Sequence, residues 1–224
     1  EKVIDYYRGL GFNSIFLRPV NYQGFARKSY KELSQKVDAW NSFYRSAMNY
    51  ILEISKDTYF EEFYTAEIVR KIFANKASGF VDYASPARYA QNYCVIDYDG
   101  KIYPTDESRM LSRTRQVDLC IGNLADGLDK NSISELNQNA IHHVHEDCLH
   151  CAYMPYCGID IIDDLSRYAQ FDLPKHNTWF CRRHMFLYDF IFEKAVTWDT
   201  DWLRLFNSWI YRSRKTSEAF EIFK

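Results

Sequence analysis

The sequence predicts a mixed α+β fold, and three features of the chain indicate it. Apolar residues recur at the spacing of amphipathic helices over long stretches of the first and last thirds of the chain. One segment, "NYCVIDYDGKIYP" (92–104), alternates instead and turns at Asp99-Gly100, which is typical of a β-hairpin with a primed turn. With 224 residues, 47% of them hydrophobic, the chain is long enough to bury a core.

The opening segment "EKVIDYYRGLGFNSIFLRPV" (1–20) predicts a helix, a glycine-containing turn and a short buried strand. One helix–strand unit cannot bury both of its sides, so we expect it to be the last piece of a βα repeat. Helical spacing then extends from about residue 30 to residue 74, with an interruption near Lys56–Thr58.

The second half of the chain predicts mainly helices around a loop that is rich in cysteine. "IGNLADGL" (121–128) is a turn-rich connection, and a short helix is expected near 132–140. Further helices are expected at about 159–168, 178–196 and 201–215.

The composition excludes several classes of protein. The formal charge is −2 and the pI about 6.3, so we expect no nucleic-acid partner. No stretch approaches the roughly 20 apolar residues of a membrane span. Four of the six cysteines fall between residues 148 and 181, which favours a metal or cluster site in a reducing, cytoplasmic compartment over a disulfide framework.

The cysteines in "CLHCAYMPYCG" (148–158) have Cys-x2-Cys-x5-Cys spacing. Cys181 supplies a fourth thiol at the start of an apolar-periodic segment. Four thiolates suit either tetrahedral Zn²⁺ or an iron–sulfur cluster, and the spacing alone does not decide between them. His145 or His150 could replace one cysteine as a zinc ligand, although four cysteines make both histidines more plausible as neighbours of the site.

These residues occur in a recognisable order. A cysteine is followed by a glycine-turn hairpin with "YPTDESRM", an "IGN" connection, the Cys-x2-Cys-x5-Cys-Gly run and a distant last cysteine. This order resembles the C-terminal SPASM-type auxiliary-cluster domain of radical SAM enzymes that modify peptides. "YPTDESRM" also resembles a stretch of maturases that act on His-Xaa-Ser-type peptides and of cyclophane-forming enzymes.

The chain departs from that family pattern at two cysteine positions. Cys94 stands for the first cysteine, but the second falls on Thr105 and a later one falls on Ile161. The resemblance therefore implies one auxiliary 4Fe–4S cluster, with a role in electron relay or structure, where the family has two. Its implied ligands are Cys148, Cys151, Cys157 and Cys181.

The resemblance covers only the C-terminal part of a full enzyme. It implies the end of a partial (β/α) barrel at 1–28, a helical connector at 29–90, and an auxiliary-cluster domain with C-terminal helices at 91–224. The chain lacks the Cys-x3-Cys-x2-Cys motif of the catalytic cluster, so by itself it should be inactive. S-adenosylmethionine and a second 4Fe–4S cluster would belong to the full enzyme, and a precursor peptide, the N-terminal radical SAM half and a reducing electron donor would be partners.

Three further residues are candidates for the site. Asp106 and Glu107 would contact substrate or accept a proton, and the simpler interpretation is a hydrated turn in which Arg109 forms a salt bridge. Arg18 would bind a carboxylate of cofactor or peptide. The alternative function is a non-catalytic zinc- or cluster-binding module for protein or peptide interaction.

Overall fold

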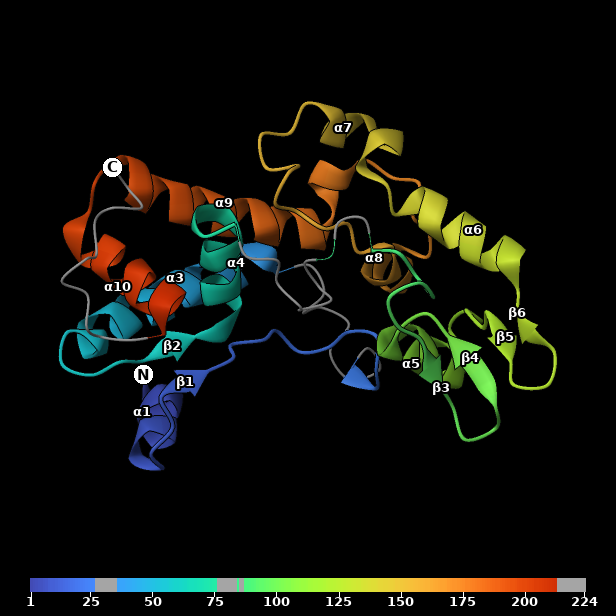
Figure 1. Cartoon of the computed structure of the whole chain (residues 1–224), viewed down its shortest axis with the longest axis horizontal. Helices are drawn as coiled ribbons and strands as arrows, with labels where there is room; N and C mark the ends of the chain where they lie inside the picture. The colour runs from blue at the N-terminus through green and yellow to red at the C-terminus, as the bar shows by residue number, and fades with distance from the viewer. Residues whose placement is uncertain (27–35, 76–83, 85–86, 213–224) are drawn as a thin grey trace. The chain divides into compact units, whose positions relative to one another are not determined.

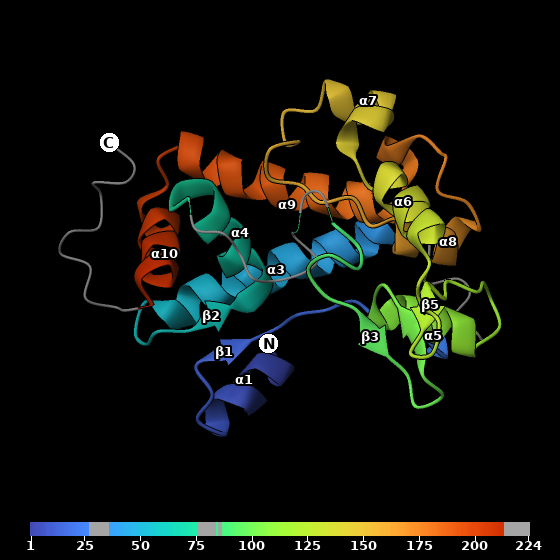
Figure 2. The same ribbon diagram turned by 45° about the vertical axis from the view of Figure 1, so that its right-hand side comes forward.

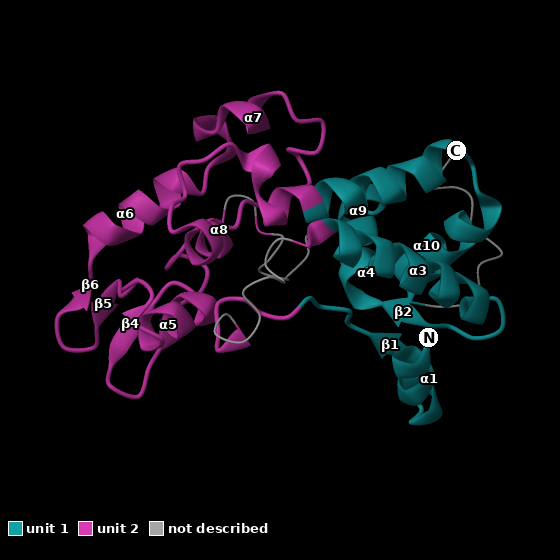
Figure 3. Ribbon diagram, turned by 180° about the vertical axis from the view of Figure 1, so that it is seen from behind, with its two compact units in different colours: residues 1–19, 38–80, 183–224 teal, residues 20–37, 81–182 magenta. Residues whose placement is uncertain are grey.

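A computed structural model of the chain describes residues 1–26, 36–75, 84 and 87–212 (Figure 1). It divides into two compact units, shown in different colours in Figure 3. Unit 1 comprises residues 1–19, 38–80 and 183–224, and unit 2 comprises residues 20–37 and 81–182. The mixed α+β class is confirmed, and no closed barrel occurs among the described residues.

Unit 1 is mainly helical. Its elements are α1 (Lys2–Gly9), β1 (Ser14–Ile15), α3 (Val37–Ser55), β2 (Glu61–Glu62), α4 (Phe63–Phe73), most of α9 (Trp179–Val196) and α10 (Thr200–Tyr211). Figure 2 shows α3, α4, α9 and α10 gathered together, and α10 packs on α4. The core between these helices is rich in aromatic side chains with almost no exposed surface, among them Tyr44, Tyr188, Phe206 and Trp209.

The opening helix and strand occur where the sequence predicts them, but the strand is shorter. β1 pairs in parallel with β2, with Ser14 opposite Glu61 and Ile15 opposite Glu62. β2 follows the predicted interruption near Lys56–Thr58 and occupies two residues that were predicted to be helical. A strand of two residues has no periodicity of its own, so its pairing with β1 is visible only in three dimensions.

A buried arginine ties β2, α4 and α10 together. Arg70 donates two hydrogen bonds to the carbonyl of Trp209, at 3.0 and 2.8 Å. Its guanidinium also pairs with Glu67 at 2.7 Å and with Glu61. All three charged side chains are almost fully buried, so this network holds the elements of unit 1 in one arrangement.

Unit 2 combines a small antiparallel sheet with short helices. The strands β3 (Val95–Ile96), β4 (Lys101–Tyr103), β5 (Gly122–Asn123) and β6 (Gly127–Leu128) lie in that order in the sheet. The helices are α5 (Asp106–Arg113), α6 (Lys130–Asn139), η3 (His142–Val144), α7 (Glu146–Leu149), α8 (Ile161–Tyr168), η4 (Lys175–Asn177) and the first turn of α9.

The predicted hairpin is confirmed, but the prediction that a primed turn joins its strands is wrong. Val95 pairs with Tyr103, and the turn closes through the bond from the Gly100 N–H to the Asp97 carbonyl at 2.9 Å. Within the turn only Gly100 has a positive φ, 80°, whereas a type I′ turn needs positive φ at both central residues. An ordinary turn followed by a left-handed glycine therefore joins the strands.

The connection at 121–128 is itself a hairpin, which the turn-rich sequence did not predict. Gly122 adopts φ +142°, and a Cβ atom there would lie 2.2 Å from the carbonyl oxygen of Gly127. Only glycine fits this close approach between β5 and β6. Among the described residues, no helix is long and apolar enough to cross a membrane.

Candidate metal centre

The four cysteines of the predicted site all lie in unit 2, and among the described residues their half-buried thiols form no disulfide. Cys148 belongs to α7, and its carbonyl accepts a hydrogen bond from the Cys151 N–H at 3.2 Å. In the next turn the Met154 N–H donates to the Cys151 carbonyl at 3.1 Å. In the turn after that, the Cys157 N–H donates to the Tyr153 carbonyl at 2.9 Å. These turns make the segment a tight loop without strands.

Cys181 lies near the start of α9. The Thr178 side chain accepts a hydrogen bond from the Cys181 N–H at 3.1 Å, as an N-cap residue does. Cys181 therefore occupies the first turn of a helix of 18 residues, where the positive end of the helix dipole favours a thiolate but burial opposes it more strongly.

Burial disfavours the thiolate form of two of the four cysteines. Burial raises the pKa of Cys148 to about 11, and the neighbouring Cys151 thiolate raises it further. Burial raises the pKa of Cys181 to about 12, and the thiolates of Cys148 and Cys151 act in the same direction. A cation that replaced the thiol protons would offset the cost of burying these thiolates.

The ligand geometry for a metal is nevertheless not assembled. Among the described residues, no three His, Cys, Asp or Glu side chains are placed to hold one metal ion together. The Cys157 thiol donates to the carbonyl of Gly158 at 3.2 Å. The donor chemistry thus fits a soft metal ion or a cluster, and binding would have to draw the sulfur atoms closer together.

The two histidines have different environments. The buried His145 contacts the carbonyl of Asn139 through Nε2 at 2.8 Å, and burial lowers the pKa of its ring. His150 is exposed at the end of α7. His145 therefore already has a bond that fixes the end of α6, while His150 stays a candidate only from its position in the sequence.

Beside the cysteines lies an ion pair that the sequence did not reveal. The Nζ atom of Lys175 donates to Asp164 at 2.7 Å and to the carbonyl of Phe171 at 2.7 Å. Both charged side chains are at most 5% exposed. Burial raises the pKa of Asp164 to about 6, and the Lys175 ammonium opposes that rise. Nothing in "DLPKHNT" distinguishes this lysine from a solvated one before the fold is known.

A second contact fixes η4 against α7. Asp147, next to Cys148, accepts hydrogen bonds from the backbone N–H of His176 at 3.4 Å and from its ring Nδ1 at 3.0 Å. α7 and η4 pack against each other at this point. The loop that carries Lys175 is therefore tethered to the helix that carries Cys148.

Thr105 and Ile161, the two positions at which the expected cysteines are missing, have structural roles. Thr105 caps α5: its hydroxyl accepts from the Ser108 N–H at 3.0 Å, and the Ser108 hydroxyl accepts from the Thr105 N–H at 2.9 Å. Ile161 is fully buried in a core cluster that includes Leu111 and Ile121. Cys94 is exposed.

The remaining predicted residues have the following surroundings. Asp106 is exposed and pairs with Arg109 at 2.7 Å, which matches the salt bridge of the simpler interpretation. Glu107 is half-buried. Arg18 belongs to unit 1, where its guanidinium lies over the ring of Phe16 at 5.0 Å from the centroid.

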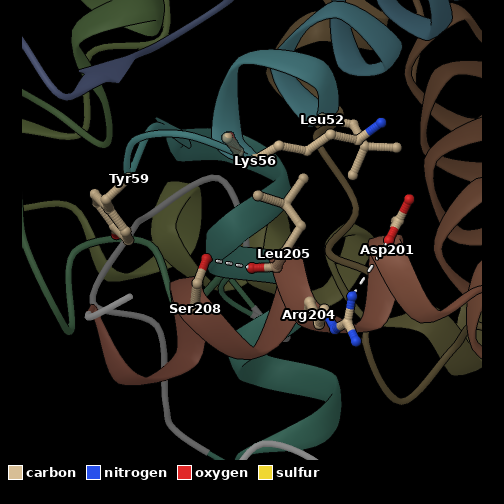
Figure 4. Close-up of a pocket in the computed structure, with 8 residues that line it drawn as sticks. Leu52, Lys56, Tyr59, Asp201, Arg204, Leu205 and Ser208 are labelled. Carbon is tan, nitrogen blue, oxygen red and sulfur yellow. Dashed lines mark hydrogen bonds and ion pairs between the residues drawn. The ribbon is translucent and has the colours of Figure 1, made fainter. Parts of the chain in front are cut away.

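Unit 1 contains a pocket of about 380 Å³ between the end of α3 and α10 (Figure 4). Two cations line it, and each already has a carboxylate neighbour: Lys56 pairs with Glu53 at 2.9 Å and Arg204 with Asp201 at 3.7 Å. None of the predicted site residues lines this pocket.

Comparison of the chain with models of known families, with curated proteins and with solved structures found no match.

Proposed function

We propose that unit 2 is an auxiliary 4Fe–4S cluster domain and that the chain is the C-terminal region of a radical SAM enzyme. The enzyme would modify a ribosomally made peptide by forming a C–C bond or another crosslink. The observation that carries this proposal is the presence of four half-buried cysteines outside any disulfide, Cys148, Cys151, Cys157 and Cys181, in one compact unit. Reduced cysteines at this spacing are typical of a soft-metal or cluster site.

The four cysteines would bind the cluster from three parts of the chain. Cys148 and Cys151 come from one turn, Cys157 from the end of the loop, and Cys181 from the first turn of α9. The bound cluster would supply a site that gains or loses one electron, or a rigid anchor for the loop. Four protein ligands leave no position open for substrate, which favours relay or anchoring over direct binding of the peptide.

The other candidate residues would act on the peptide or on the cofactor of the full enzyme. Asp106 and Glu107, in the first turn of α5, would contact the precursor peptide or accept a proton from it. Arg18 would pair with a carboxylate of S-adenosylmethionine or of the peptide. The partners are the precursor peptide, the N-terminal radical SAM half and a reducing electron donor.

The test is metal and sulfide analysis of the chain purified without oxygen, with a visible spectrum. We expect about four irons and four sulfides per chain. Cys151→Ala and Cys181→Ala should lose both, whereas Cys94→Ala, which removes an exposed thiol outside the ligand set, should keep them. One zinc ion with no sulfide would overturn the cluster and support the alternative, a non-catalytic binding module. Full iron content in Cys151→Ala would also contradict the proposal.

A further inference from the structure

The pocket of unit 1 has the size and the lining of a small-molecule site (Figure 4). Its volume of about 380 Å³ lies within the range of about 300 to 1,000 Å³ that such sites occupy. The end of α3 and the residues after it form one side, and α10 forms the other. Leu52 and the buried Leu205 give the pocket an apolar wall. The other side chains in the lining are charged or carry a hydroxyl group, so the pocket suits a small polar ligand with a short carbon skeleton.

Arg204 and Asp201 present charged groups of opposite sign to this pocket. They lie one turn apart on α10, and Nη1 of Arg204 is 3.7 Å from Oδ1 of Asp201. This distance is too long for a hydrogen bond, and neither side chain forms one with another described residue. The guanidinium donors and the carboxylate oxygens therefore remain available to a ligand.

Lys56 adds a second positive charge from the α3 side of the pocket. Its ammonium pairs with Glu53 at 2.9 Å, and both side chains are about half exposed or more. Exposed ion pairs of this kind contribute little to stability. An anion in the pocket can therefore replace Glu53 as the partner of Lys56 at little cost.

Two hydroxyl groups of the lining act as hydrogen-bond acceptors. The Ser208 hydroxyl donates to the carbonyl of Leu205 at 2.7 Å, and the Tyr59 hydroxyl donates to Glu61. Because each proton is already used within the chain, the oxygen atoms of these hydroxyls can only accept hydrogen bonds from a ligand. The ligand that fits must therefore carry donors as well as negative charge.

We propose that this pocket binds a free acidic α-amino acid, glutamate or aspartate. The lining has two positive groups and one negative group, and such a ligand has two carboxylates and one ammonium. The α-carboxylate and the α-ammonium share one carbon, so they match the neighbouring Arg204 and Asp201, and the planar guanidinium suits a carboxylate. The second carboxylate binds Lys56. This site lies in unit 1, needs neither the cysteines nor a metal, and goes beyond the proposed function.

The test is isothermal titration calorimetry of the full chain with L-glutamate and L-aspartate, in a buffer without carboxylate or phosphate. Saturation transfer difference NMR extends it to weak binding. Glutamine lacks the second carboxylate, and glutarate lacks the ammonium. We expect the better of the two acidic amino acids to bind about tenfold more tightly than glutamine or glutarate, the effect of one hydrogen bond to a charged group. Absence of saturable binding, or equal affinity for glutarate, would overturn the proposal.

Three variants test the assigned contacts. Arg204→Gln, Lys56→Gln and Asp201→Asn each remove one charge from an exposed side chain, so the fold should persist, as circular dichroism will show. Each should weaken binding about tenfold. Glu53→Gln, which removes the competing partner of Lys56, should bind at least as tightly as the wild type. Lys130→Gln, which removes an exposed charge from unit 2, should leave the affinity unchanged.

The variants also show which result would contradict the assignment. Wild-type affinity in Arg204→Gln would place the binding elsewhere on the surface and overturn the proposal. Tighter binding in Asp201→Asn would indicate a simple anion site, with no contact to an ammonium, and would overturn it as well. Losses in the three pocket variants, with wild-type affinity in Lys130→Gln, support it.

Discussion

The position at which the family pattern has a cysteine and this chain has Ile161 allows a quantitative prediction. Ile161 has no exposed surface and packs among the apolar side chains of unit 2. Ile161→Ala removes three buried carbon atoms, and at about 0.8 kcal/mol for each the loss of transfer free energy is about 2.4 kcal/mol. The cavity left behind raises the expected loss in the free energy of unfolding to about 3 to 4 kcal/mol.

The assay is urea denaturation of apo-protein, followed by circular dichroism. Hydrogen exchange of peptides from α5 and α8 should accompany it, because a chain with two compact units need not unfold in a single transition. Ile96→Ala is the matched control: Ile96 belongs to the same unit but is 55% exposed, so its loss should stay below about 1 kcal/mol. If Ile161→Ala costs no more than Ile96→Ala, the assignment of Ile161 to the core is wrong.

Three other substitutions test separate contacts. Thr105→Ala removes the cap of α5 and should cost about 1 kcal/mol in urea denaturation, while Thr105→Ser, which keeps the hydroxyl, should cost little. Arg70→Met leaves Glu61 buried without its cation and should lower the free energy of unfolding by about 3 to 5 kcal/mol. Arg204→Met removes an exposed arginine and should lower it by under about 1 kcal/mol. Equal losses in the two variants would contradict the buried network. The third concerns pH. Because the pKa of Asp164 is raised to about 6 in the folded chain, its contribution to stability is fully present below about pH 4 and is lost as the pH rises through 6. Relative to Asp164→Asn, the free energy of unfolding of the wild type should therefore fall by about 2 to 3 kcal/mol between pH 4 and pH 7, and parallel pH curves would refute this.

Much of the local structure follows from patterns within short stretches. Most helices occur near their predicted ranges because burial of one face imposes a spacing of three to four residues that a single helix displays by itself. The β3–β4 hairpin is visible for the same reason, since its strands alternate and a glycine lies between them. The predicted end of the last helix, beyond residue 212, lies outside the described residues.

The candidate site was only partly accessible from sequence. The spacing of the cysteines indicates a metal or cluster site because nearby thiols in a reducing compartment are typical ligands. The same spacing could not show how the cysteines are placed in space, and the structure brings all four into one compact unit without placing three of them to hold one metal ion. That information depends on where α9 begins relative to α7, which is a long-range property.

By itself, the sequence determined the α+β class, the helical stretches, one hairpin and a set of cysteines at the spacing of metal ligands. Only the tertiary structure decided that β2 pairs with β1, that 121–128 forms a hairpin, and that Lys175 and Asp164 are buried together. The physical reason is the same in each case. A two-residue strand has no period, and a lysine or an aspartate is solvated by default, so their pairing arises from contacts between segments far apart along the chain.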